Sequence, residues 1–263
     1  MKDRRKCSVT CFGVGDGWPC ADRNHSSFLY RFGGTSLLVD CGEAVAGSWK
    51  ASGPGYEAPD GILISHLHAD HIGGFFMLMQ GFWLEGRRAD LPVYLPGGAI
   101  RPLRAMLRTM FVFDELLNFR LQLLPLKPRR TLAFRDVRVT AFPTSHLDGL
   151  RAKFGKKYRG DFSANSFLFQ SGGRRVGHSA DLGRPEDLEP LLGKPLDLLV
   201  CELAHFAPED LFFYLRGRRI GRIVFVHLAR NYWEDFARTR RLAAKMLPDI
   251  PHTFAHDGAV ISL

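Results

Sequence analysis

The chain has 263 residues, of which 46% are hydrophobic and 24% are charged, and its formal net charge is +9. This composition is typical of a globular protein and excludes a disordered chain. No apolar run approaches the ~20 residues of a membrane-spanning helix, so we expect no membrane contact. The basic balance favours polyanionic partners such as nucleic acids or phosphorylated substrates.

Three features of the chain predict its setting and organisation. Residues 1–6 are charged and lack the apolar core of a signal peptide, so we expect a protein that is not secreted. The five cysteines include no CxxC pair, which fits a reduced, cytoplasmic location. No composition shift marks a linker, so we predict one domain, residues 1–263, built from two similar halves.

Apolar runs bounded by turn residues predict a sheet in the first half. Strands are expected at 7–14, 28–32, 36–40, 61–64 and 91–95. Helical spacing predicts helices at 75–82 and 100–113. The glycine-rich loop at 13–17 is not a dinucleotide fingerprint, because no helix is expected to follow it.

The second half repeats this rhythm. Hairpins are expected from 132–134 with 137–142 and from 163–170 with 174–178, followed by strands at 196–201, 222–226, 253–254 and 259–263. Helices are expected at 185–192 and 232–246. Strands that alternate with helices predict an α/β fold.

The stretch from Ser65 to Gly74 carries three histidines and an aspartate within six positions. His66 and His68 follow a short buried strand and face the same side, because side chains alternate with period two. Asp70 and His71 lie in the turn that leads into the next helix. Imidazole and carboxylate ligands suit zinc and its first-row neighbours, so this stretch predicts a metal site with room for two ions.

Other polar residues lie at the carboxyl ends of four further predicted strands. They are His146, Asp181, Glu202 and His227. Ligands of α/β sheets bind at that edge, so we expect these side chains to meet the histidine stretch.

With these residues, the sequence resembles the metallo-β-lactamase superfamily, whose αββα sandwich of two mixed β-sheets flanked by helices holds one or two metal ions. The resemblance covers nearly the whole chain, and the HxHxDH motif matches without departure. It implies two divalent ions, with zinc expected and manganese or iron also suited to the ligands. The resemblance also implies which residues hold the two ions. His66, His68 and His146 bind the first ion, Asp70, His71 and His227 bind the second, and Asp181 bridges the two.

The chemistry of such a pair of ions predicts hydrolysis. Two ions about 3.5–4 Å apart acidify a bridging water, and the resulting hydroxide attacks an ester while the ions clamp its oxygens. Asp70 is part of the catalytic set in this scheme, and a proton donor is expected near the leaving oxygen.

Within the superfamily, the sequence is most similar to ribonuclease Z-like phosphodiesterases. The runs at 23–27 and 38–43 and the residues after His227 carry this likeness. Glu202 resembles the glutamate of that branch's His-Glu-Ala-Thr motif, which assists protonation of the leaving group. Cys201 replaces the histidine of that motif, and His205 is a second candidate proton donor.

Two further departures separate this chain from that branch. In the motif that follows His227, Arg230 lies one residue before the position at which that branch has an arginine. Asn231 occupies that arginine position instead. The long glycine–proline arm insertion is also missing from the sequence. These differences count against pre-tRNA processing and leave metal-dependent phosphodiester hydrolysis as the expectation.

Two basic clusters have different predicted roles. Residues 151–159 hold five basic residues, two aromatics and no acid, directly after the His146 loop. Such a segment can hold phosphates and stack a base, and the competing interpretation is a solvated hairpin tip. We expect a second cluster, at 216–222, to be solvated surface at the opposite sheet edge. The predicted substrate contacts are Lys153, Lys156, Lys157, Arg159 and, as a phosphate clamp beside His227, Arg230.

The leading hypothesis is therefore a dinuclear metal-dependent phosphodiesterase that acts on RNA or a nucleotide-like diester. The family likeness alone suggests a homodimer. Three alternatives remain open, which are a hydrolase of a non-phosphate ester, thioester or lactam, a di-iron redox protein, and a non-catalytic nucleic-acid-binding module.

Overall fold

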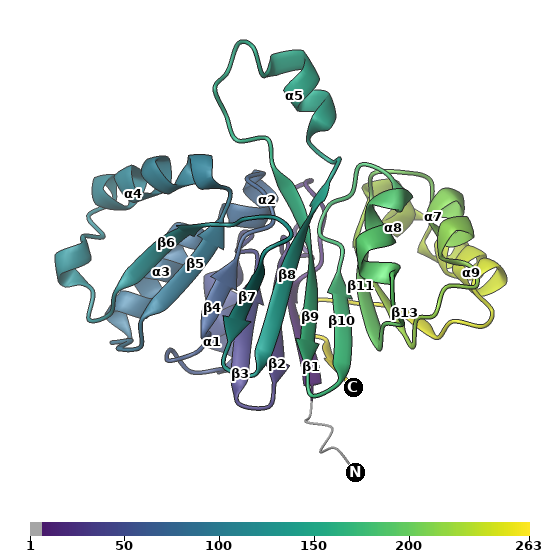
Figure 1. Ribbon diagram of the computed structural model, residues 1–263, viewed down its shortest axis with the longest axis horizontal. Helices are drawn as coiled ribbons and strands as arrows, with labels where there is room; N and C mark the ends of the chain where they lie inside the picture. The colour runs from purple at the N-terminus through teal and green to yellow at the C-terminus, as the bar shows by residue number, and fades with distance from the viewer. Residues whose placement is uncertain (1–6) are drawn as a thin grey trace.

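The computed structural model describes residues 7–263, so the charged start at residues 1–6 lies outside the described residues. Two seven-stranded sheets pack face to face, and helices cover their outer faces (Figure 1). Each sheet contains both antiparallel and parallel neighbours. This arrangement confirms the predicted α/β sandwich of two mixed β-sheets flanked by helices.

The first sheet joins the N-terminal half of the chain to the last strand. Its order is β14-β1-β2-β3-β4-β5-β6, with antiparallel pairing from β14 to β3 and parallel pairing from β3 to β6. The strands are β1 (Cys7–Gly13), β2 (Ser27–Phe32), β3 (Thr35–Val39), β4 (Gly61–Leu63), β5 (Leu91–Leu95), β6 (Leu121–Pro125) and β14 (Val260–Ser262).

The second sheet comes from the C-terminal half. Its order is β13-β12-β11-β10-β9-β8-β7, antiparallel from β7 to β10 and parallel from β10 to β13. The strands are β7 (Thr131–Phe134), β8 (Val137–Thr144), β9 (Ala164–Ser171), β10 (Arg174–His178), β11 (Leu198–Leu203), β12 (Ile223–Leu228) and β13 (His252–Phe254).

The helices divide between the two outer faces. The first half contributes α1 (Val45–Ser52), α2 (Ala69–Ile72), α3 (Phe75–Leu84), α4 (Ile100–Thr109) and the 3₁₀ turns η1 (Gly97–Ala99) and η2 (Asp114–Leu116). The second half contributes α5 (Asp148–Phe154), η3 (Pro185–Leu188), α6 (Glu189–Leu192), α7 (Pro208–Leu215), α8 (Arg230–Glu234) and α9 (Phe236–Met246). None of the helices within residues 7–263 has the length and apolar character needed to cross a bilayer.

Three apolar layers hold the sandwich together. The middle layer lies between the sheets and includes Val9, Tyr30, Phe169 and Val200. Helices α1, α3 and α4 bury a second layer against the first sheet, and α6, α7 and α9 bury a third against the second sheet. The central strands are therefore covered on both faces, which explains their continuous apolar runs.

Several predicted element bounds were wrong. The helix expected over 232–246 is two helices, because Asp235 has φ −116° and caps α9 by accepting a hydrogen bond from the Arg238 amide. Helix α4 ends at Thr109, before the left-handed Phe111. Strands β11 and β12 end two residues later than predicted, and β11 also begins two residues later.

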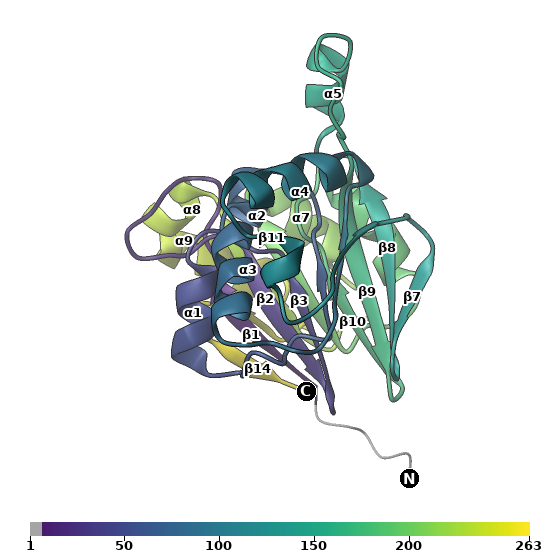
Figure 2. The same cartoon turned by 90° about the vertical axis from the view of Figure 1, so that its left-hand side faces the viewer.

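The parallel strands of both sheets point their carboxyl ends toward one edge of the sandwich. The residues that follow β4, β8 and β10 lie at this edge, and so do the last residues of β11 and β12. Helix α5 projects from the same edge, above the body of the molecule in both views (Figures 1 and 2). We call this the upper edge, and the opposite edge, which contains the β9–β10 turn, the lower edge.

Candidate metal centre

Asp40 holds the histidine stretch in place. Its carboxylate accepts hydrogen bonds from the Ser65 amide (2.7 Å) and the Ser65 hydroxyl (2.8 Å), and it lies 2.7 Å from His71 Nδ1. A ring proton on Nδ1 leaves His71 Nε2 free to bind a metal. Burial raises the pKa of Asp40, although His71 and Ser65 oppose the shift.

A glycine allows the chain after β3 to approach this stretch closely. A Cβ at Gly42 would lie 2.4 Å from the Asp70 carbonyl oxygen and 2.6 Å from the His25 carbonyl carbon. Both neighbours are backbone atoms, which cannot rotate away. Position 42 therefore requires glycine.

The first ligand group brings three imidazoles to one carboxylate. His66 and His68 follow β4, His146 follows β8, and Asp181 follows β10. Asp181 Oδ2 lies 3.5 Å from His146 Nε2 and 3.7 Å from His66 Nε2. His146 Nε2 lies 3.2 Å from His68 Nδ1.

The second group shares the same aspartate. Asp181 Oδ1 lies 3.2 Å from His71 Nε2, and Asp181 Oδ2 lies 3.5 Å from His227 Nε2. Asp70 Oδ2 lies 3.4 Å from His71 Nε2 and 3.9 Å from His227 Nε2. The structure thus brings all seven predicted ligands into two groups that meet at Asp181.

The donor atoms of the two groups fit divalent ions. Two ligand atoms bound to one zinc ion at about 2.0–2.2 Å lie no more than about 4.4 Å apart, and every separation given above is shorter. His66 Nε2, His71 Nε2 and Asp181 Oδ1 are buried without a hydrogen-bond partner among the described residues. Buried polar atoms are rarely left unsatisfied, so these three atoms favour cations as their natural partners.

Protonation differs between the imidazoles of the site. Burial lowers the pKa of His66, and it lowers the pKa of His146 to about 4, so both rings are neutral and ready to bind metal at neutral pH. Burial opposes a charge on His71 as well, but the carboxylates of Asp181 and Asp40 outweigh it and raise its pKa. A cation beside Asp181 would compete with that proton.

His227 is held in place by contacts with residues that are far away in the sequence. It lies inside β12 with a left-handed φ of 50°, and its amide donates to the Val14 carbonyl. The Ser26 hydroxyl lies 3.0 Å from His227 Nδ1, so Nε2 faces Asp181. The first sheet therefore orients a ligand of the second.

Glu202 is hydrogen-bonded to His205, the other candidate proton donor. Glu202 is buried, and its carboxylate accepts from the Leu182 amide (2.8 Å), the Ala204 amide (2.7 Å) and His205 Nδ1 (2.8 Å). His205 Nε2 lies 3.7 Å from Asp181 Oδ2, and its side chain is 31% exposed. His205 is thus the member of this pair that reaches both the metal ligands and solvent.

The same contact sets the charge of His205. Burial lowers its pKa, but the hydrogen bond and the charge of Glu202 outweigh burial and raise it to about 9. The imidazole is then positively charged at neutral pH and able to donate a proton.

The basic stretch forms a projecting arm (residues 147–162) rather than a hairpin tip. It contains α5, which buries none of its own residues, and the turn after it. Asp161 anchors the base of the arm by accepting from the Gly98 amide at 2.9 Å. Arg151 donates to the Phe162 carbonyl at 3.1 Å.

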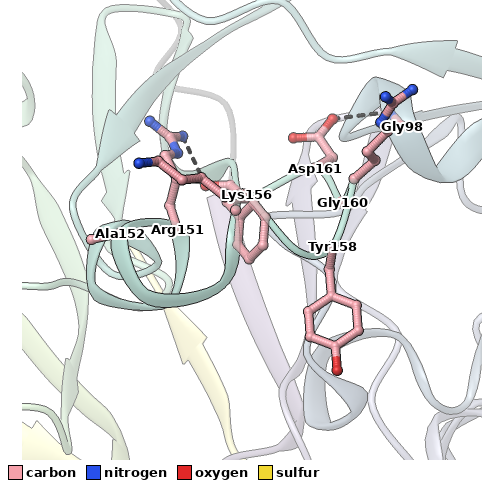
Figure 3. A pocket seen from close by; sticks show the side chains of 10 residues that line it. Gly98, Arg151, Ala152, Lys156, Tyr158, Gly160 and Asp161 are labelled. Carbon is pink, nitrogen blue, oxygen red and sulfur yellow. Dashed lines mark hydrogen bonds between the residues drawn. The ribbon is translucent and has the colours of Figure 1, made fainter.

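A hollow of about 710 Å³ lies between this arm and Gly98. Figure 3 shows Arg151, Lys156 and Tyr158 around it, with Asp161 linked to Gly98. Arg159 also lines the hollow, whereas Lys153 does not, and its ammonium lies over the Phe154 ring instead. Lys157 lies over the Tyr158 ring.

Arg230 lies in a different environment from the one expected of a phosphate clamp. It begins α8, and its Nε donates to Glu234 one turn later at 2.8 Å. Its guanidinium covers the Trp18 ring at 5.9 Å. The contact with Glu234 is a surface ion pair, and contact of Arg230 with substrate stays a prediction.

Besides His205, four histidines lie outside the two ligand groups, and one of them, His252, contacts the Ile250 carbonyl. His178 is buried in the core, with its Nδ1 2.8 Å from the Tyr30 hydroxyl, as expected of a core histidine. His25 is buried with Nδ1 3.6 Å from Glu43. His256 is exposed and forms a local contact with the Asp257 carbonyl.

A comparison with protein families identifies the class of this fold and site. The model of the beta-lactamase superfamily domain matches residues 35–228, which include all seven predicted ligands. The chain therefore belongs to the β-lactamase superfamily.

The curated relatives with significant similarity include proteins named ribonuclease Z. The protein from Clostridium perfringens is 30% identical over 268 residues, which cover 85% of this chain and 84% of that protein. The protein from Archaeoglobus fulgidus is 33% identical over 139 residues, or 53% of this chain and 44% of that protein. The match thus spans less than half the length of the archaeal relative.

Solved structures share the fold over the full chain. A metallo-β-lactamase fold protein from Bacillus subtilis has a TM-score of 0.78 at 21% identity and covers 98% of this chain and 100% of that chain. The short form of human tRNase Z has a TM-score of 0.69 at 20% identity and covers 97% and 98%. At these identities the likeness establishes the fold alone.

Proposed function

We propose that this chain, acting as one catalytic domain, is a dinuclear metal-dependent phosphodiesterase whose substrate is RNA or a nucleotide-like diester. The observation that carries the proposal is the pair of ligand groups that share Asp181. The relationship to a ribonuclease Z over most of both chains supports the choice of a phosphodiester over other esters. Zinc is the proposed metal, because three of the four donors in the first group are imidazole nitrogens.

In this proposal His66, His68 and His146 would hold one ion, Asp70, His71 and His227 would hold the other, and Asp181 would serve both. Two bound divalent ions would supply an acidified water and neutralise the charge that develops on the phosphodiester. His205 donates a proton to the leaving oxygen, and Glu202 keeps His205 charged and oriented.

The arm supplies the proposed substrate contacts. It starts directly after His146, and its exposed cations, Lys153, Lys156, Lys157 and Arg159, can neutralise backbone phosphates of a bound strand. Tyr158 is 55% exposed and offers a face for a base. A cytoplasmic location and a homodimer stay predictions.

The experiment that tests the proposal removes the shared ligand. Asp181→Ala is expected to abolish hydrolysis of bis(p-nitrophenyl) phosphate and to lower the metal content of the purified protein. Asp90→Ala is the control, because Asp90 forms a surface ion pair with Arg120 at 2.8 Å and belongs to neither ligand group. Turnover that survives in Asp181→Ala at the parental rate would refute the proposal.

A further inference from the structure

Four turns at the lower edge of the second sheet carry most of the net charge of the molecule. They are residues 134–138, 171–175, 193–197 and 216–222. Together they hold nine basic residues and two acidic ones, a formal charge of +7 in a chain whose total is +9. We call this surface the lower basic edge. Its basic members are Arg135, Arg138, Arg174, Arg175, Lys194, Arg216, Arg218, Arg219 and Arg222.

Backbone hydrogen bonds join these turns into one surface. The Asp197 amide donates to the Arg175 carbonyl at 2.8 Å, and the Leu196 amide donates to the Arg219 carbonyl at 3.0 Å. Arg138 pairs with Gln170 across β8 and β9, next to the β9–β10 turn. The cations are therefore neighbours in space, although they come from four separate segments.

Only part of this charge is neutralised by nearby acids. Arg174 pairs with Asp197 at 3.1 Å, Arg135 with Asp60 at 3.1 Å, and Arg218 with Glu189 at 3.1 Å. Five exposed cations take no part in these three ion pairs, and they are Arg138, Lys194, Arg216, Arg219 and Arg222. The surface therefore keeps a strong positive potential.

The surface is also concave. A hollow of about 540 Å³ is lined by five cations and one acid, Asp136, together with residues of the β9–β10 turn. The five cations are Arg135, Arg138, Arg174, Arg175 and Lys194. This volume lies within the range of roughly 300–1,000 Å³ that is usual for ligand sites. Converging like charges repel one another, so a hollow of this kind is stabilised by an anion that carries several charges.

We propose that the lower basic edge is a second RNA-binding surface that holds the phosphate backbone. Eight of its nine cations are arginines, whose planar guanidinium groups bind phosphate oxygens in pairs. None of the exposed large apolar side chains of residues 7–263 lies in the four turns, so the surface lacks the groups that insert into a lipid bilayer. The proposal goes beyond the hydrolysis proposed above, which concerns the upper edge.

The lower basic edge is separate from the candidate metal centre. Strand β9 runs from the upper edge, where Asn165 donates to the Ser65 carbonyl, to the turn at Gly172. Its eight residues span about 26 Å at roughly 3.3 Å per residue. RNA held at this distance is not positioned for attack, so the surface concentrates RNA on the protein rather than aligning the scissile bond.

The test reverses two cations that belong to no ion pair named above. Arg138→Glu with Lys194→Glu is compared with Arg238→Glu and Arg241→Glu on α9, which change the net charge equally at another surface. Binding of a short single-stranded RNA is measured by fluorescence anisotropy over a series of salt concentrations. Both pairs are placed in an Asp181→Ala background so that the probe is not cleaved.

The lower-edge pair is expected to weaken RNA binding about tenfold at low salt and to reduce the slope of log affinity against log salt by roughly 1.4. The α9 pair is expected to change both quantities much less. Hydrolysis of bis(p-nitrophenyl) phosphate, measured with Asp181 intact, is expected to stay at the parental rate in both pairs, which separates this proposal from the proposed function.

Equal RNA affinity and equal salt slope in the two pairs would overturn the proposal. It would also be overturned if the lower-edge pair lost binding to phosphatidylserine vesicles while its RNA affinity was unchanged, because the anion would then be a lipid surface.

Discussion

Asp40 supports the geometry of the candidate metal centre from outside the two ligand groups. It belongs to neither predicted ligand group, yet it bonds both Ser65 and His71. Asp40→Asn keeps the shape but replaces a charged acceptor, so His71 loses its fixed orientation. We expect metal affinity to fall by about 10–100-fold, as measured by competition with a chromophoric chelator.

Asp60→Asn is a suitable control for that experiment, since Asp60 accepts from the Ser36 amide and lies in neither ligand group. Equal metal affinities for Asp40→Asn and the parental protein would contradict the role given to Asp40.

His205 is expected to matter only where the leaving group needs a proton. A general acid contributes about 10²–10⁴-fold to such reactions. His205→Asn should therefore slow cleavage of an RNA dinucleotide by about 10²-fold or more, because its leaving oxygen is strongly basic. Cleavage of bis(p-nitrophenyl) phosphate should change little, because p-nitrophenolate leaves without protonation.

Comparison of kcat for the two substrates gives this selectivity directly. An equal loss on both substrates would assign His205 to metal binding or folding instead of proton donation. Glu202→Gln should show the same selectivity as His205→Asn, since Glu202 acts through its contact with His205.

His178 predicts a specific dependence of stability on pH. Burial lowers its pKa to about 3, so it stays neutral in the folded protein while the unfolded chain protonates near pH 6.5. The unfolded state then binds one more proton between these values. Protonation of His178 in the unfolded chain should therefore lower the free energy of unfolding by about 1.4 kcal/mol for each pH unit below about 6.5.

His178→Gln can keep a hydrogen bond to Tyr30 without titrating, so it should lose that component of the slope. Urea unfolding of metal-free protein between about pH 4 and 7 measures the difference between the two proteins. Parallel stability curves for variant and parent would mean that His178 protonates without cost in the folded state.

At the scale of elements, the arm projects from the upper edge, and its helix α5 buries none of its own residues. Arg151 bonds Phe162 within the arm, and Asp161 links the arm to Gly98. Its cations are exposed and the arm begins directly after His146, so they are available to a bound strand. Replacing Lys156, Lys157 and Arg159 with alanine should lower the salt slope of RNA affinity by roughly 0.7 for each bound phosphate that the substitutions release.

The matching control replaces Arg238, Arg241 and Lys245 of α9, which removes the same charge from another surface. If both triple variants had the parental salt slope, the arm would be a solvated projection that does not touch the substrate.

How much the sequence predicts differs between elements. The histidine stretch is readable because its ligands are adjacent, and His146, Asp181 and His227 are readable because each lies at the end of an apolar run. Asp40 and Ser26 could not be recognised as supporting residues, since their roles arise from contacts with distant ligands.

Some helices and strands were not predicted from the sequence, and there are physical reasons for this. Helix α5 has no apolar stripe because it packs against no core. Strand β6 is a short edge strand that ends at Pro125. Helix α7 was also not predicted, although the sequence contains its start signals. Pro208 lies at its first position and two acids lie in its first turn.

At the scale of the whole molecule, the two sheets contribute unequal parts of one centre. The first sheet supplies the histidine stretch and the second supplies His146, Asp181 and His227. Neither sheet alone holds a complete ligand group. Assembly of the sandwich and metal binding should therefore be coupled, and metal should raise the thermal midpoint of unfolding in a concentration-dependent way.

The central claim is that two ions bind per chain and that both are needed. Its most direct test is a metal titration of the stripped protein, in which bound metal per chain and hydrolysis of bis(p-nitrophenyl) phosphate are measured on the same samples. We expect turnover to rise to its maximum only as occupancy approaches two ions per chain. Full turnover at one ion per chain, or turnover without bound metal, would contradict the claim.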